Sequence, residues 1–223
     1  MSKPALPIVV LISGSGSNLQ AIIDAIKARQ LNAEIRAVIS NRAEAFGIDR
    51  AKQAGITTHI IDHREHADRE SFDQAMMQII DSYQPALVVL AGFMRILSDE
   101  FVNHYQDRMI NIHPSLLPEF RGLNTHQRVL EAGRDKHGVS IHYVTSELDS
   151  GPLVIQAMVN VENSDTADSL AEKIHQQEHV IYPMVIQWLA EERLQCKNNQ
   201  LFFNHQPLTS PLIWENNTLQ NSN

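Results

Sequence analysis

An asparagine and a histidine stand two residues apart in the segment 111–118, NIHPSLLP. Side chains two residues apart on an extended strand point to the same face, so Asn111 and His113 should lie side by side. Pro114 and Pro118 prevent regular continuation of the strand. The amide could donate to a carbonyl oxygen that becomes negative, and the imidazole could move a proton. The pair alone is equally compatible with a structural histidine beside a capping asparagine.

A carboxylate that could join this pair is Asp149, in the turn segment 147–152, ELDSGP. At a glycine turn an aspartate can reach into a neighbouring cleft, and an aspartate beside a histidine stabilises the protonated imidazole. Turns also favour aspartate for conformational reasons alone. A chemical role for Asp149 is therefore indicated only if it lies beside His113.

The first loop, GSGSNL at residues 14–19, has the composition of an anion site. Glycines let backbone amides approach an anion, and a following helix N-terminus favours negative charge. Leu19 replaces the third glycine of a dinucleotide motif, and no Lys-Ser/Thr pair of a triphosphate loop follows. We expect this loop to bind one phosphate group, although a plain strand-to-helix turn has the same pattern.

Two further segments could contribute to a site. The segment 91–97, AGFMRIL, follows a buried strand and offers apolar side chains where α/β folds bind ligands. Glu178, in a long helical segment, could accept hydrogen bonds from an amine or hydroxyls. The alternatives are a loop covering the core and a solvated helix face.

The elements that must position these residues alternate along the first half of the chain. Apolar runs predict strands, and apolar residues at helical spacing predict helices between them. The expected strands cover residues 8–12, 35–40, 57–61 and 86–91, and the helices 19–28, 43–54 and 71–83. This alternation predicts an α/β fold with a Rossmann-like, mostly parallel central sheet flanked by helices.

The second half is less regular. We expect strands at 109–112, 140–144 and 153–161, helices at 125–132 and 167–192, and a hairpin at 194–203, with a kink or restart at Pro183 and a frayed polar end from 215. The chain should form a single domain, 1–223. It would comprise a phosphate-binding lobe (about 1–100), a catalytic lobe (about 101–205) and a polar tail (206–223).

Composition excludes several classes of protein. The 223 residues carry a net charge of −8, which argues against nucleic acid as the main partner. Cys196 is the only cysteine, and no apolar stretch reaches membrane length, so we expect a soluble, cytoplasmic protein. His175 and His179 are one helical turn apart without a third ligand nearby in sequence, so we expect no metal site. No Gly-x-Ser-x-Gly elbow of a hydrolase is correctly placed.

Five motifs, in order, resemble the folate-dependent phosphoribosylglycinamide formyltransferases. They are VLISGSGSNLQAI (10–22), LAGFMRIL (90–97), NIHPSLLP (111–118), ELDSGP (147–152) and QEHVIYP (177–183). The resemblance runs from about residue 7 to about residue 195. It implies a fold of the formyltransferase type and direct formyl transfer from 10-formyltetrahydrofolate to the amine of glycinamide ribonucleotide.

The resemblance also implies roles for particular residues. Asn111 would steady the formyl oxygen, His113 would donate the proton, and Asp149 would stabilise the charged form of His113. The substrate phosphate and ribonucleotide would lie against Gly16, Ser17, Asn18, His175, Gln176, Gln177 and Glu178. The folate would contact Arg69, Met94, Arg95, Ile96, Leu97, Asn111, Thr145, Ser146, Glu147, Leu148 and Asp149. The co-substrate is a small molecule, no metal is implied, and the protein would be a monomer or homodimer.

The chain departs from the family pattern at two positions. Asn124 stands where a histidine often supports the catalytic carboxylate, so we expect weaker support there or its replacement by Ser140. Ser146 stands where an acidic residue is common.

Other functions remain open at this stage. A formyltetrahydrofolate hydrolase would share the Asn-His-Asp chemistry but typically carries an extra N-terminal domain, for which the first strand at about residue 7 leaves no room. Methionyl-tRNA formyltransferase typically has an extra C-terminal domain and needs a basic surface. A non-catalytic sensor of phosphate metabolites would need only the loop at 14–19.

Overall fold

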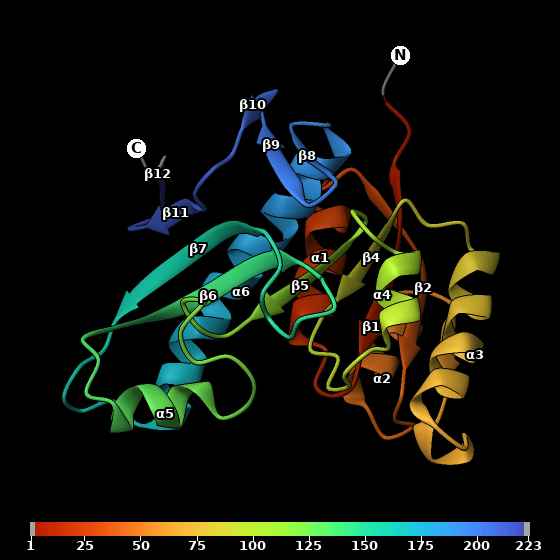
Figure 1. Cartoon of the computed structure of the whole chain (residues 1–223), viewed down its shortest axis with the longest axis horizontal. Coiled ribbons are helices and arrows are strands. Elements are labelled where there is room, and N and C mark those ends of the chain that lie inside the picture. The colour runs from red at the N-terminus through yellow and green to blue at the C-terminus, as the bar shows by residue number, and fades with distance from the viewer. Residues whose placement is uncertain (1–2, 221–223) are drawn as a thin grey trace.

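The computed structural model describes residues 3–220, and the chain forms the α/β fold expected from the sequence (Figure 1). The strands are β1 (Leu6–Ile12), β2 (Ala33–Ser40), β3 (Thr58–Ile60), β4 (Leu87–Leu90), β5 (Met109–His113), β6 (Lys136–Tyr143), β7 (Leu153–Asn160), β8 (Leu194–Lys197), β9 (Gln200–Phe203), β10 (Gln206–Pro207), β11 (Leu212–Glu215) and β12 (Thr218–Gln220). The helices are α1 (Ser17–Lys27), α2 (Phe46–Gln53), α3 (Arg69–Ser82), α4 (Asp99–His104), α5 (Thr125–Glu131) and α6 (Ala167–Ala190), with a 3₁₀ turn at His63–Glu65.

The described strands form a nine-stranded sheet in the order β12-β11-β7-β6-β5-β4-β1-β2-β3 and a small sheet, β10-β9-β8. Within the large sheet, β3, β2, β1, β4 and β5 are parallel, and β6 runs antiparallel to β5. The carboxyl ends of β1, β4 and β5 therefore meet at one edge, where α/β folds bind ligands. The expected mostly parallel sheet is confirmed.

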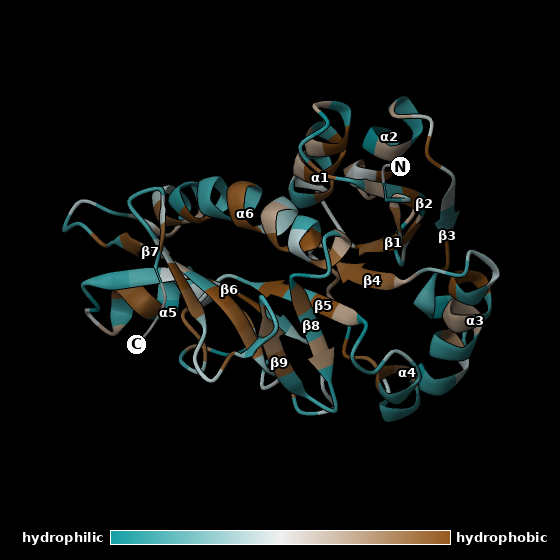
Figure 2. Cartoon of the chain, turned by 90° about the horizontal axis from the view of Figure 1, so that it is seen from above, coloured by the Kyte–Doolittle hydropathy of each residue, from teal (hydrophilic) through white to brown (hydrophobic). Residues whose placement is uncertain are grey.

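Helices cover both faces of the sheet, and alternate residues of β1 supply the two cores. Ile8, Val10 and Ile12 pack with α1, α2 and α6, whereas Val9 and Leu11 face α3 and α4. Side chains alternate across a strand, so a fully apolar run suits a strand buried on both faces. Figure 2 shows hydrophobic strands in the middle and hydrophilic surfaces on much of the surrounding helices. No helix in the described part of the chain is long and apolar enough to cross a membrane.

The turn between β1 and α1 packs closely against α2. Gly16 has φ 68°, and a Cβ atom there would lie 2.5 Å from the Cα of Gly47. The Gly47 amide also donates to the Gly14 carbonyl at 3.0 Å. Because the left-handed conformation and the close backbone approach both exclude a side chain, Gly16 fixes the shape of this loop.

The structure differs from the sequence prediction in several places. α4 was not predicted, because the helix is too short for a clear apolar stripe. Ser98, immediately before it, accepts a hydrogen bond from the Phe101 amide at 3.3 Å and so caps the helix. α6 runs through Pro183 without a restart. The frayed end predicted from 215 was wrong as far as residue 220, because β11 pairs with β7 and β12 with β11; residues 221–223 lie outside the described part.

The C-terminal strands should therefore contribute to stability. Leu212 on β11 is 1% exposed, and Leu212→Ala should lower the free energy of unfolding by about 2–4 kcal/mol in urea titrations, as for other buried leucines. Leu123→Ala is the matched control, since Leu123 is 71% exposed and its loss should cost less than about 0.5 kcal/mol. Equal stability of the two variants would show that β11 does not belong to the folded core.

Candidate active site

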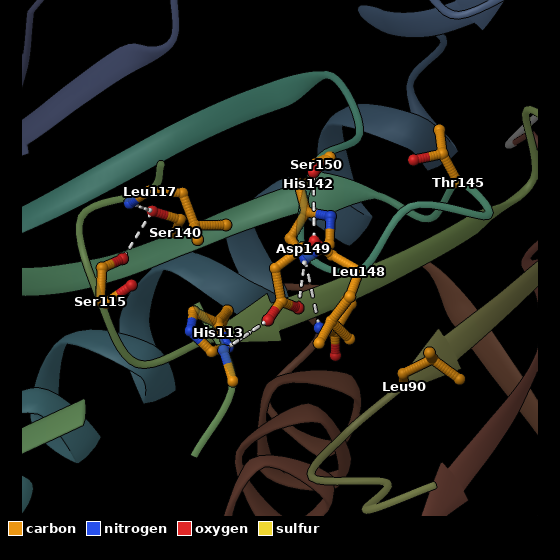
Figure 3. Close-up of polar contacts among 12 residues, drawn as sticks. Leu90, His113, Ser115, Leu117, Ser140, His142, Thr145, Leu148, Asp149 and Ser150 are labelled. Carbon is orange, nitrogen blue, oxygen red and sulfur yellow. Dashed lines mark hydrogen bonds and ion pairs between the residues drawn. The ribbon is translucent and has the colours of Figure 1, made fainter. Parts of the chain in front are cut away.

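The predicted Asn-His-Asp residues come together at the end of β5. Asn111 and His113 both lie on this strand. Asp149 reaches His113 from the turn between β6 and β7 (Figure 3). The carboxylate Oδ2 lies 3.5 Å from Nδ1 of His113, and the two side chains are only 7–8% exposed. The structure thus brings together residues 36 positions apart (149 − 113 = 36) in a largely dehydrated setting.

The Asp149 carboxylate is held from three sides. Besides His113, it accepts a hydrogen bond from the Gly122 amide at 3.0 Å, and Oδ1 lies 3.7 Å from Nε2 of His142. Asp149 has φ 50°, a conformation that costs energy for a residue with a side chain. The turn is further fixed by Gly151, where a Cβ would clash with the Tyr143 carbonyl oxygen. These constraints aim the carboxylate at the two imidazoles.

Both ring nitrogens of His113 face acceptors. Nε2 donates to the Phe120 carbonyl oxygen at 3.1 Å, and Nδ1 faces the Asp149 carboxylate. Only the charged imidazolium can donate to both atoms. Because Asp149 supplies the opposite charge, the arrangement suits His113 as a proton donor.

His142 belongs to the cluster, and the sequence analysis missed it. It lies directly opposite Asn111 in the β5–β6 pairing, and its Nε2 is 3.2 Å from Nδ2 of Asn111. Burial lowers the pKa of this imidazole. The alternation of Ser140 and His142 on one strand was a signal that His142 shares a face with polar groups, but the register that places it beside Asn111 could not be read from the sequence.

The expected phosphate loop forms the N-terminus of α1. Gly16 precedes the helix, Ser17 is its first residue, and no side chain caps its free amides. Asn18 is 7% exposed and donates through Nδ2 to Oε2 of Glu178 at 2.8 Å. Its Oδ1 is buried without a partner within the described residues. Free helix amides and an unused acceptor are suited to an anion with a neighbouring donor group.

The α6 segment predicted to face this loop divides into two parts. Glu178 is 4% exposed, and its burial raises the pKa of the carboxyl group. His175 is exposed and stacks on His179 with ring centroids 6.2 Å apart, and Gln176 is exposed as well. Gln177 instead lines a separate cavity of about 250 Å³ together with Met158 and Glu215. The structure therefore joins Glu178 to the loop, whereas Gln177 lies at the β7–β11 side of α6.

The residues expected at the folate include several exposed apolar side chains. Met94, Ile96 and Leu148 are 63%, 62% and 50% exposed. The Met94 amide donates to Oγ of Ser13 at 2.8 Å, which ties the loop after β4 to the end of β1. Exposed apolar side chains near a polar cluster are typical of a ligand-binding surface.

The remaining folate candidates lie around this surface with different partners. The guanidinium of Arg95 lies 5.6 Å from the centre of the Phe72 ring, and its Nε is buried without a partner within the described residues. Arg69, the first residue of α3, pairs with Glu70 at 3.2 Å. Leu97 is half-buried, Ser146 is exposed, Thr145 donates to the Glu147 carbonyl at 3.4 Å, and Glu147 pairs with Arg121 at 2.8 Å.

Support for the Asp149 carboxylate does not come from Ser140, and that expectation was wrong. Oγ of Ser140 donates to the Ser115 carbonyl at 2.7 Å and accepts from the Leu117 amide at 3.0 Å. It also accepts from Nε2 of Gln156 at 2.9 Å. Ser140 thus holds the chain that leaves His113, and the Gly122 amide supports Asp149 instead.

A second pair of histidines lies near His113. Nδ1 of His126 and Nε2 of His137 are 2.9 Å apart. Burial lowers the pKa of both rings, that of His137 to about 4, and the neighbouring charge of His113 adds to the effect. Within residues 3–220, no three His, Cys, Asp or Glu side chains gather closely enough to hold a metal ion.

Comparison with known proteins shows the family of the chain. Residues 6–186 match the family described as "Formyl transferase", and the chain belongs to the formyl transferase family. It is 52% identical to the phosphoribosylglycinamide formyltransferase of Escherichia coli K12, over 90% of this chain and 95% of that protein. A solved phosphoribosylglycinamide formyltransferase from Coxiella burnetii is 56% identical with a TM-score of 0.88, covering 92% of this chain and 96% of that one.

A third relative is a much larger protein, of which only a part is similar to this chain. The human trifunctional purine biosynthetic protein adenosine-3 is 42% identical over 88% of this chain, which spans 20% of that protein. Within the formyl transferases, the chain therefore groups with the phosphoribosylglycinamide formyltransferases, which it matches over nearly their whole length.

The buried histidine pair predicts a pH-dependent stability. An unfolded histidine titrates near pH 6.5, so between about pH 6.5 and pH 4 the unfolded chain binds a proton that folded His137 does not. The free energy of unfolding should fall as the pH drops through this window, by on the order of 3 kcal/mol from His137. Urea titrations of His137→Gln should show a shallower fall.

The control for this measurement is His205→Gln, since His205 is exposed. It should follow the wild-type pH dependence. The assignment would be contradicted by the same slope in all three proteins.

Proposed function

We propose that this protein transfers the formyl group of 10-formyltetrahydrofolate to the amine of N1-(5-phospho-D-ribosyl)glycinamide in de novo purine biosynthesis. The observation that carries the proposal is the buried contact of His113 with Asp149 at the end of β5, beside Asn111. Acyl transfer needs a group that stabilises the developing oxyanion and an acid for the leaving nitrogen. The kinship with phosphoribosylglycinamide formyltransferases supports this choice of donor and acceptor.

The ribonucleotide would bind at the start of α1. The amides following Gly16 and the side chain of Ser17 would hold its phosphate group, and Asn18 with Glu178 would accept hydrogen bonds from its hydroxyls or amine. A helix N-terminus favours the doubly negative phosphate, which explains how a protein with a net charge of −8 can bind an anion locally.

The folate would lie over the loop after β4 and the turn that carries Asp149. Met94, Ile96 and Leu148 offer exposed apolar contacts for its flat ring. In this arrangement the pterin end would lie beside Asn111 and His113, and the rest of the folate would extend toward Arg69 and Arg95. The residues at 94–97 and 145–149 thus form the co-substrate side of the proposed site.

The reaction follows from these positions. The substrate amine attacks the formyl carbon, and the carbonyl electrons move to the formyl oxygen. An N–H of Asn111 and the His113 imidazolium stabilise that oxygen. The carbonyl then re-forms as the bond from the formyl carbon to the folate nitrogen breaks, and the electron pair of that bond goes to the folate nitrogen, which receives a proton that His113 supplies. The attacking nitrogen loses one proton in turn, and this proton restores His113 to its starting state. The Nε2–H of His113, which here donates to the Phe120 carbonyl, is the hydrogen that the substrate would take over.

The experiment is formyl transfer measured with glycinamide ribonucleotide and with water as alternative acceptors. The wild-type protein should transfer to the ribonucleotide, and His113→Ala should lower kcat by about 100-fold or more, as for a general acid. His205→Ala, at an exposed position, is the control. Transfer to water alone would indicate a hydrolase, and near-normal turnover of His113→Ala would refute the role of His113.

A further inference from the structure

His142 carries an inference beyond the Asn-His-Asp set. It is 2% exposed and lies between Asn111 and Asp149, in contact with both. Each nitrogen of a buried imidazole must present a hydrogen or a lone pair that suits its polar neighbour, because an unsatisfied polar atom costs about 1–3 kcal/mol in such surroundings.

The first constraint comes from the backbone. Nδ1 of His142 lies 2.8 Å from the Tyr143 carbonyl oxygen, which can only accept. Nδ1 therefore carries the hydrogen. The alternative neutral tautomer would point a nitrogen lone pair at that oxygen.

The second constraint follows for Nε2. The group 3.2 Å from Nε2 is Nδ2 of Asn111, which can only donate. Nε2 must then accept, so it has a lone pair and the ring is neutral; burial, which lowers the pKa of His142, favours the same state. If the amide were turned over, its carbonyl oxygen would face the same lone pair. The Asn111 amide is thereby held in one of its two orientations.

We infer that His142 is a positioning residue that fixes which hydrogen of Asn111 faces the formyl oxygen. One N–H of Asn111 Nδ2 donates to Nε2 of His142, and the side-chain amide makes no other hydrogen bond within residues 3–220. The second N–H of Nδ2 can therefore donate to the formyl oxygen that becomes negative, and its direction is fixed by the hydrogen bond to His142. This inference rests on the proposed function for the role of Asn111, although the orientation itself does not.

A neutral His142 also preserves the charge of Asp149 for His113. Oδ1 lies 3.7 Å from His142 and Oδ2 lies 3.5 Å from His113. Two charged imidazoles would share one carboxylate and repel each other. With the hydrogen of His142 placed on the Tyr143 side, the single negative charge has a single cationic partner.

Two near-isosteric substitutions separate the two nitrogens. His142→Asn can still place a donor where Nδ1 stood, but it has no atom at the place of Nε2. His142→Gln can place its carbonyl oxygen near Nε2 and accept from Asn111. His142→Asn should lower kcat by about 10-fold or more, since a misplaced oxyanion donor costs up to the 10²–10³-fold of its complete loss. KM for both substrates should stay within about threefold, and His142→Gln should recover most of kcat.

The imidazole itself can be observed without turnover. Long-range ¹H–¹⁵N NMR of the ligand-free wild-type protein should show His142 as the neutral tautomer protonated at Nδ1 at pH 7. A ring protonated at Nε2, or equal kcat values for His142→Asn and His142→Gln, would overturn the inference. If the wild-type protein formylates no ribonucleotide, the proposed function fails, and the NMR spectrum alone decides the orientation.

Discussion

The site depends on one buried carboxylate. Asp149 joins a turn after β6, the end of β5 and the loop at Gly122, and its only cationic neighbour in the Asn-His-Asp cluster is His113. Removing such a charge from water costs several kcal/mol unless it is paired and hydrogen-bonded. The left-handed backbone at Asp149 is a further local cost that the rest of the fold must hold in place. The His113 imidazole and the Gly122 amide are the groups that can donate to that carboxylate.

The two histidines around it have different hydrogen-bonding partners. His113 faces two acceptors, so it can donate through both nitrogens, whereas His142 faces one acceptor and one donor, which suits a neutral ring with its hydrogen on Nδ1. One fold thus places an acid and an orienting group within reach of a single carboxylate. Differences between neighbouring titratable groups of this kind are characteristic of acid–base sites.

Much of the fold followed from local pattern. The apolar run at 8–12 and the alternation after it predicted the parallel half of the sheet, because a strand buried on both faces needs a continuous apolar run. The motif residues Asn111, His113 and Asp149 were found as well, since their residue types suit no core and their motifs resemble one family. These signals lie within short stretches of chain.

What failed depends on long-range pairing. β11 and β12 have polar neighbours and gain stability only by pairing with β7 and each other, which local composition does not reveal. Ser140 and His142 lie on the same face of one strand, and the sequence did not distinguish their roles. Only the register with β5 shows that Ser140 contacts the segment after His113, whereas His142 contacts Asn111. Gln177 and Glu178 are neighbours on α6, but the turn of the helix directs them to different places. Glu178 contacts the phosphate loop, whereas Gln177 faces β7 and β11.

The central claim is that Asp149 acts on formyl transfer through His113. A double-mutant cycle tests it, with kcat measured for Asp149→Asn, His113→Ala and the combination. Residues that act as one unit are non-additive, so the double variant should be within about threefold of the slower single variant. Losses that multiply would show that the carboxylate and the imidazole act independently, and would contradict the account.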